Sequence, residues 1–120
     1  MTKQDLSSTI SWTLLSVVLN GLFFGHGVLV VSSSGGLALV GLSAIVYALA
    51  GLSLLGAAWL TPFPAIAVMT RLLSVVYAVF LLTLAWQLDV LRGFEGLAGI
   101  VILLAVVAAN QLAVKRVLTR

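Results

Sequence analysis

The feature that most constrains this chain is a long run without any Asp, Glu, Lys or Arg, from Leu6 to Thr70. Such a run is long enough for two membrane-spanning helices of about 20 residues each. Of the 120 residues in the chain, 62% are hydrophobic and only 8% are charged, whereas about 25% are charged in an ordinary soluble domain. Because so few charges cannot cover a water-facing surface, the sequence predicts an integral membrane protein with the lipid bilayer as its immediate partner.

Three interruptions divide the apolar sequence. Residues 32–36 form a small polar run, residues 61–64 contain two prolines that lack a backbone donor, and residues 89–96 hold charges and glycines. The apolar segments do not alternate polar and apolar side chains as the strands of a membrane barrel do. We therefore predict an all-α, four-helix membrane bundle in one transmembrane domain over residues 1–120. The expected spans are about 9–31, 37–60, 65–88 and 96–117.

The first apolar segment has the length of a full span and is followed by further apolar segments. A cleavable signal peptide has a shorter apolar stretch and precedes a soluble remainder. We therefore expect this segment to be retained.

The basic residues predict the orientation, since positively charged flanks stay in the cytoplasm. They gather near the chain ends at Lys3, Lys115, Arg116 and Arg120. An even number of spans puts both termini on one side, so we predict that both are cytoplasmic, in the inner membrane of a bacterium. Trp12 and Trp59 then fall at the inner interface and Trp86 at the outer one. Basic residues placed this way account for the net charge of +3 without a nucleic-acid partner.

Small residues in the spans predict close helix packing, because small side chains let backbones approach in lipid. The first span has a GxxxG motif, and the second and fourth have faces rich in small residues. The predicted packing residues are Gly21, Gly25, Ala44, Ala48, Gly51, Ala105 and Ala109. We expect packing mainly within the bundle, with an interface between copies of the chain as the alternative.

Polar and ionisable side chains within the spans form a candidate intramembrane polar site. Its members are Asn20, His26, Tyr47, Arg71, Tyr77 and Asn110. Asn20 shares a helical face with Ser16 and Gly27, about 20–40° away at 100° per residue. We interpret the mid-depth polar residues as a clamp between helices, and the lining of a small cavity is the alternative.

Arg71 is the one permanent charge inside an apolar run, about 9 Å from the inner edge of its span at 1.5 Å per residue. Its side chain can reach the headgroups, and its depth allows a contact with Asn110 or Gln111. An anion or lipid-headgroup site is the alternative. His26 is expected to be a neutral, hydrogen-bonded structural histidine at the depth of Ser43, with a proton-relay or ligand-binding role as the alternative.

The chemistry that catalysis and metal binding need is absent from the spans. They contain no carboxylate, the chain has no cysteine, and it has neither a Ser/His/Asp set nor a glycine-rich phosphate loop. We therefore expect no enzymatic activity, no metal and no cofactor.

The stretch from Gly21 to Gly27, with an aromatic residue followed by Gly-His-Gly, resembles the first span of the DoxX-like family of small four-helix membrane proteins. The stretch from Ala50 to Gly56 and the triplet Arg71-Leu72-Leu73 are similar to the second and third spans of that family. The resemblance implies a four-helix bundle, in a family sometimes linked to quinone or sulfur redox systems. Val28 stands here in the region where that family usually has a charged residue.

Taken together, these patterns favour a non-enzymatic structural or accessory subunit that packs against other membrane proteins or against itself. One alternative is a small-solute or ion transporter with a cavity between Asn20, His26, Tyr47 and Arg71. Another is a quinone-linked redox component that uses His26.

Overall fold

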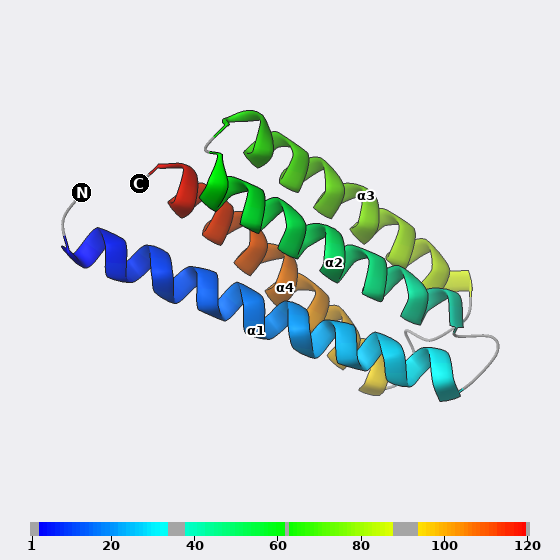
Figure 1. Cartoon of the computed structure of the whole chain (residues 1–120). Coiled ribbons are helices and arrows are strands. Elements are labelled where there is room, and N and C mark those ends of the chain that lie inside the picture. Colours follow the sequence, from blue (N-terminus) through cyan, green and yellow to red (C-terminus); the bar gives the residue numbers. More distant parts are fainter. Residues whose placement is uncertain (1–2, 34–37, 62, 88–93, 120) are drawn as a thin grey trace.

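The fold is a bundle of four helices. The computed structural model describes the backbone of residues 3–33, 38–61, 63–87 and 94–119. The helices in these ranges are α1 (Lys3–Ser33), α2 (Ala38–Leu60), α3 (Ala65–Gln87) and α4 (Phe94–Leu118). Each runs antiparallel to the next, and they lie side by side (Figure 1). The prediction of an all-α fold with four helices is confirmed.

The helix ends follow the predicted spans except at the start of α1. Helices α2, α3 and α4 begin and end within two residues of the predicted limits, whereas α1 begins at Lys3, six residues earlier than expected. The predicted start followed the apolar composition. The helical hydrogen bonds of α1 also include the polar residues that precede the apolar segment. The apolar part of α1 runs from Leu6 to Ser32.

The corner between α2 and α3 contains Pro64, the residue just before α3. Helix α2 ends at Leu60, and the Phe63 amide donates to the Thr61 carbonyl over 2.8 Å. The Ile66 amide donates to the Phe63 carbonyl over 3.0 Å, so α3 starts at once after Pro64. A proline just before a helix costs no hydrogen bond, because the first turn has no intrahelical acceptor for its amides.

The four helices form a rhombus in cross-section. Within the described ranges, α1 and α3 each pack on α2 and α4, and α2 also meets α4, but the backbones of α1 and α3 do not approach each other. The bundle measures 48 × 23 × 22 Å. Each helix contains a stretch long and apolar enough to cross a membrane. At one end, here called the termini end, α1 begins, α4 ends, and α2 turns into α3 (Figure 1).

The interior has two apolar clusters separated by a polar layer. The cluster nearer the termini end consists of Leu55, Ala58, Ile66, Ala113, Val114 and Val117. The other consists of Phe23, Ala44, Tyr47, Tyr77, Leu103 and Val106. Between them along the helices lie the buried polar residues Ser16, Asn20, Ser74 and Asn110.

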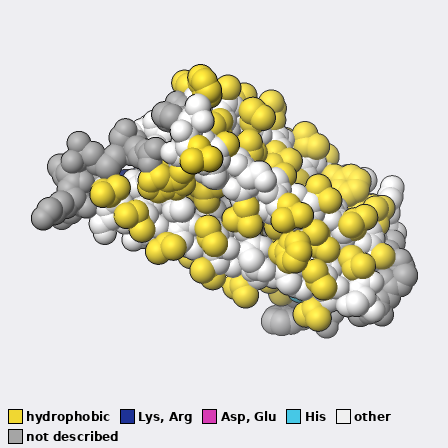
Figure 2. Space-filling view, in the orientation of Figure 1, with side chains coloured by type: hydrophobic (Ala, Val, Ile, Leu, Met, Phe, Trp, Pro, Cys, Tyr) yellow, Lys and Arg dark blue, Asp and Glu magenta, His cyan; other side chains and the backbone are white. Residues whose placement is uncertain are grey.

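The outer surface is apolar. Large hydrophobic side chains on all four helices are exposed, among them Leu22, Leu49, Val76 and Leu104. In the view of Figure 2, hydrophobic side chains are spread along the described part of the visible face, with other side chains and backbone between them. The molecule thus has an apolar outer surface around an interior that contains a layer of polar side chains between two apolar clusters.

Candidate functional site

A layer of five polar side chains crosses the middle of the bundle, with at least one from each helix. Ser16 and Asn20 come from α1, Tyr47 from α2, Ser74 from α3 and Asn110 from α4, and all are buried. Ser16 and Asn20 are one helical turn apart and face the same way, since residues four apart share a face. We call these five residues the polar layer.

The centre of the polar layer is a pair of amides that bind each other in both directions. Asn20 Nδ2 donates to Asn110 Oδ1 over 2.5 Å, and Asn110 Nδ2 donates back to Asn20 Oδ1 over 3.3 Å. Ser16 Oγ also donates to Asn110 Oδ1 over 2.5 Å. Asn20 Nδ2 further donates to the Ser16 carbonyl over 2.7 Å, so α1 and α4 are joined by a closed set of hydrogen bonds.

Tyr47 extends these bonds to the other two helices. Asn110 Nδ2 donates to the Tyr47 hydroxyl over 3.2 Å, and the Tyr47 hydroxyl lies 2.9 Å from Ser74 Oγ. Because the Tyr47 oxygen accepts from Asn110, its own hydrogen is free to point to Ser74. The polar layer therefore connects α1, α4, α2 and α3 in one continuous chain.

Gly51 makes room for the amide pair. A Cβ atom at this position would lie 2.9 Å from Asn110 Nδ2 and 3.4 Å from Asn20 Oδ1. Any side chain there would push against the two amides. Gly51 is thus the position on α2 that lets this helix close over the polar layer.

An aromatic group borders the polar layer on the side away from the termini end. The rings of Tyr47 and Tyr77 stack with centroids 4.4 Å apart and an interplanar angle of 12°, and Phe23 meets both rings edge-on. The Tyr77 hydroxyl is buried and has no hydrogen-bond partner in the described part of the chain. The Ser43 hydroxyl is close to it, but that hydroxyl donates to the Val40 carbonyl over 2.7 Å.

The structure brings together only part of the predicted polar site. Asn110 binds both Asn20 and Tyr47, and the Tyr77 ring stacks on the Tyr47 ring. His26 and Arg71 are exposed on the outside. Neither makes a hydrogen bond or ion pair with a described residue.

Two contacts that helix depth allows are therefore not formed. Arg71 does not bind Asn110, because the Asn110 amide points into the bundle and is occupied by Ser16, Asn20 and Tyr47. His26 does not bind Ser43, whose hydroxyl turns back to its own helix. The position of a residue along its helix sets its depth in the bundle, but it does not set the direction in which the side chain points.

The predicted packing residues fall into a buried group and an exposed group. Ala44, Ala48, Gly51 and Ala109 are buried between helices. Gly21, Gly25 and Ala105 are exposed. A Cβ atom on Gly21 or Gly25 would meet nothing within 4 Å, so these two glycines do not pack against another helix of the bundle.

The close contact of α1 instead uses Gly27, which packs on Gly41 of α2. A Cβ on Gly27 would lie 2.7 Å from the Gly41 carbonyl oxygen, and a Cβ on Gly41 would lie 2.6 Å from the Gly27 carbonyl oxygen. This contact could be recognised in the sequence, because Gly27 shares a helical face with the polar residues Ser16 and Asn20. Gly21 and Gly25 lie on the opposite side of α1, away from α2 and α4.

No group of three or more metal-ligating side chains occurs in the part of the chain that the structure describes. No family model matches the chain, and no curated protein or solved structure matches it. The geometry of the polar layer and of the outer surface therefore carries the functional conclusion.

Proposed function

We propose that the chain is a multi-pass protein of a bacterial inner membrane that acts as a non-enzymatic structural or accessory subunit. Its partner is another membrane protein or a second copy of itself. The membrane location is supported by the four long apolar helices and by the apolar outer surface. In lipid, exposed Leu and Val side chains cost nothing, and buried polar groups must bind each other.

The observation that carries the structural role is the saturation of the Asn110 amide. Both of its hydrogens are donated, to Asn20 and Tyr47, and its oxygen accepts from Ser16 and Asn20. A group that binds a passing solute or a substrate has to leave some hydrogen-bonding capacity open. Asn110 leaves none, so its role is to hold the helices together.

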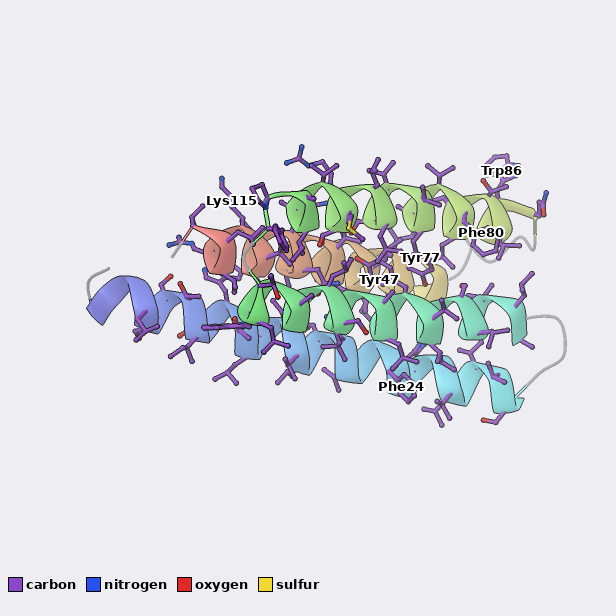
Figure 3. All side chains as sticks on the ribbon, turned by 45° about the horizontal axis from the view of Figure 1, so that its top comes forward. Phe24, Tyr47, Tyr77, Phe80, Trp86 and Lys115 are labelled. Atoms are coloured by element: carbon purple, nitrogen blue, oxygen red, sulfur yellow. The ribbon has the colours of Figure 1, made fainter. Side chains whose placement is uncertain are left out.

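Both termini are proposed to lie in the cytoplasm. Lys115 and Arg116 occupy the last turn of α4, at the termini end, and basic flanks are retained on the cytoplasmic side. Trp59 lies near the same end, where its indole nitrogen donates to Thr13 Oγ1 over 3.1 Å. Trp86 is exposed towards the other end of α3 (Figure 3).

The outward face of α1 is the proposed docking surface. Gly21 and Gly25 lie one turn apart on it, and the space above both is open. Two glycines four residues apart let the backbone of another helix come close, which is the basis of GxxxG association in membranes.

The test is chemical cross-linking and native mass spectrometry of the protein purified from its own membrane in a mild detergent. We expect a dimer or a co-purifying membrane protein. The Gly25→Leu variant should lose this partner, because the larger side chain holds the second helix away. Leu72→Phe on the outer face of α3 is the matched control and should keep it.

A strictly monomeric protein with nothing bound would contradict the subunit proposal. So would a complex that is as abundant in the Gly25→Leu variant as in the unmodified chain, since the docking surface would then lie elsewhere.

One observation favours a second candidate function, the passage of a small polar solute. The buried Tyr77 hydroxyl has no partner among the described residues, so it is available to a guest molecule. Solute flux into vesicles that contain the protein would test this candidate. A flux that disappears in Tyr77→Phe would favour it over the subunit role.

A further inference from the structure

Three cationic side chains are exposed at the termini end of the bundle. Lys115 and Arg116 lie in the last turn of α4, and Arg71 lies on α3. Figure 3 places Lys115 where α4 ends beside the beginning of α3. Arg71 is six residues beyond Ala65, which puts its Cα about 9 Å deeper along α3 at 1.5 Å per residue.

These cations lack a counter-ion in the described part of the protein. No ion pair or hydrogen bond joins any of the three side chains to a described residue. The sequence places one acidic residue, Asp5, in the first turn of α1 at this end. No side chain among the described residues therefore neutralises the positive charge of Arg71, Lys115 and Arg116.

The depth of each cation matches a layer of the bilayer. The polar headgroup region is about 5–8 Å thick on each side of the hydrocarbon core. Lys115 and Arg116, at the helix end, fall within that thickness. Arg71 falls below it, where its long side chain can extend upward to the lipid phosphates.

The surroundings of Arg71 suit a phospholipid better than a free ion. Next to Arg71 on α3, Leu72 and Val75 are exposed and apolar, so they present a surface to acyl chains. The guanidinium fork binds a phosphate through two parallel hydrogen bonds. One lipid molecule can satisfy the charge and the apolar surface together.

We propose that the termini end binds anionic phospholipids, with Arg71 as the deepest phosphate contact and with Lys115 and Arg116 attracting the headgroup layer. This inference rests on the proposed membrane location and does not depend on the proposed protein partner. The far end offers a contrast, because the described residues in the last two turns of α3 are uncharged. We expect no lipid preference there.

The experiment measures quenching of tryptophan fluorescence by brominated lipids in vesicles that contain the full chain. A variant with Trp12→Phe and Trp86→Phe retains Trp59 as a reporter of the termini end. A variant with Trp12→Phe and Trp59→Phe retains Trp86 as a reporter of the other end. Each is reconstituted with brominated phosphatidylglycerol, which is anionic, or with brominated phosphatidylcholine, which is zwitterionic.

We expect phosphatidylglycerol to quench Trp59 in preference to phosphatidylcholine, and the two lipids to quench Trp86 equally. Arg71→Leu should lower the preference at Trp59 about fivefold, the usual contribution of one basic residue near an anionic surface. Arg71→Lys, which keeps the charge, should retain most of it. Val79→Leu, at an exposed position about two turns further along α3, is the matched control and should leave it unchanged. Arg71→Gln replaces Arg71→Leu if the latter does not insert.

Equal quenching of Trp59 by the two lipids would overturn the inference, and so would a preference that survives both Arg71→Leu and Arg71→Gln. A preference abolished by millimolar inorganic phosphate would indicate a free-anion site and would overturn the lipid assignment. Extraction at alkaline pH separates the two levels of the account. A chain released from membranes contradicts the membrane location, whereas an integral chain without a lipid preference contradicts only this inference.

Discussion

The two faces of α1 carry glycines in opposite surroundings. On the inner face, Gly27 is so close to α2 that a Cβ atom would lie 2.7 Å from the Gly41 carbonyl oxygen. On the outer face, a Cβ on Gly21 or Gly25 would meet nothing within 4 Å. One helix thus uses glycine for internal packing on one side and leaves it open on the other.

Glycine spacing alone therefore does not identify the packed face of a membrane helix. Gly21 and Gly25 have the spacing associated with close packing, yet they face outward. The packed face is instead marked by polar residues, because Ser16 and Asn20 must find partners inside the bundle. The predictions below test this contrast.

The largest effect is expected for Gly27→Leu. The new side chain collides with the backbone of α2, which cannot move without shifting the whole helix. Overpacking usually costs 1–3 kcal/mol, and we expect a loss of about 3 kcal/mol in the free energy of unfolding. The measurement is reversible unfolding in mixed detergent and lipid micelles. Gly25→Leu is the matched control. In micelles dilute enough to hold one chain each, it should change the free energy by less than about 0.5 kcal/mol. Equal losses in the two variants would remove the contrast between the faces.

Asn110→Leu is expected to have the second-largest effect. It removes the hydrogen bonds to Ser16, Asn20 and Tyr47. Each bond between membrane helices contributes about 0.6 kcal/mol on average, so the loss should be about 2 kcal/mol. Gln111→Leu, one residue along, makes the same kind of change outside the polar layer and should cost much less in the same unfolding assay. An Asn110→Leu variant as stable as the unmodified chain would exclude a structural role for the layer.

Tyr47→Phe should have a smaller effect, about 1 kcal/mol, because two hydrogen bonds are lost. The ring remains, so its stacking on Tyr77 is retained. Cysteines introduced at exposed positions on α2 and α3 would report the change, since cross-linking between these helices should become less specific. No change in stability would mean that the contact between Tyr47 and Ser74 contributes nothing.

Tyr77→Phe should have the smallest effect, within about 0.5 kcal/mol of the unmodified chain. Its hydroxyl is buried without a partner among the described residues, and removing an unsatisfied polar group is neutral or stabilising. Thermal denaturation in detergent measures this directly. A loss as large as that of Tyr47→Phe would show that the Tyr77 hydroxyl binds a group within the folded protein.

Much of the fold could be predicted from the sequence, for a physical reason. Apolar runs of span length have few alternatives to helices in a bilayer, and residues such as Pro64 interrupt them at recognisable places. The limit at Lys3 could not be predicted in this way, because composition marks the apolar part of a helix and not the end of its hydrogen bonding.

The candidate site could be predicted only in part. Asn20 and Tyr47 are polar residues expected at mid-depth, and both bind Asn110, which the depth argument had paired with Arg71. Arg71 and His26 point outward, which could not be predicted because depth carries no information on rotation about the helix axis. Rotation is set by which neighbour each helix packs on, and this depends on contacts between distant parts of the chain.

The polar layer holds the bundle together, and the coupling energy between Asn20 and Asn110 measures this role. The unfolding free energies of Asn20→Leu, Asn110→Leu and the double variant, compared with that of the unmodified chain, give the energy of this pair alone. We predict a coupling energy of about 1–2 kcal/mol for the two reciprocal bonds. Additive losses, with a coupling energy near zero, would contradict the claim.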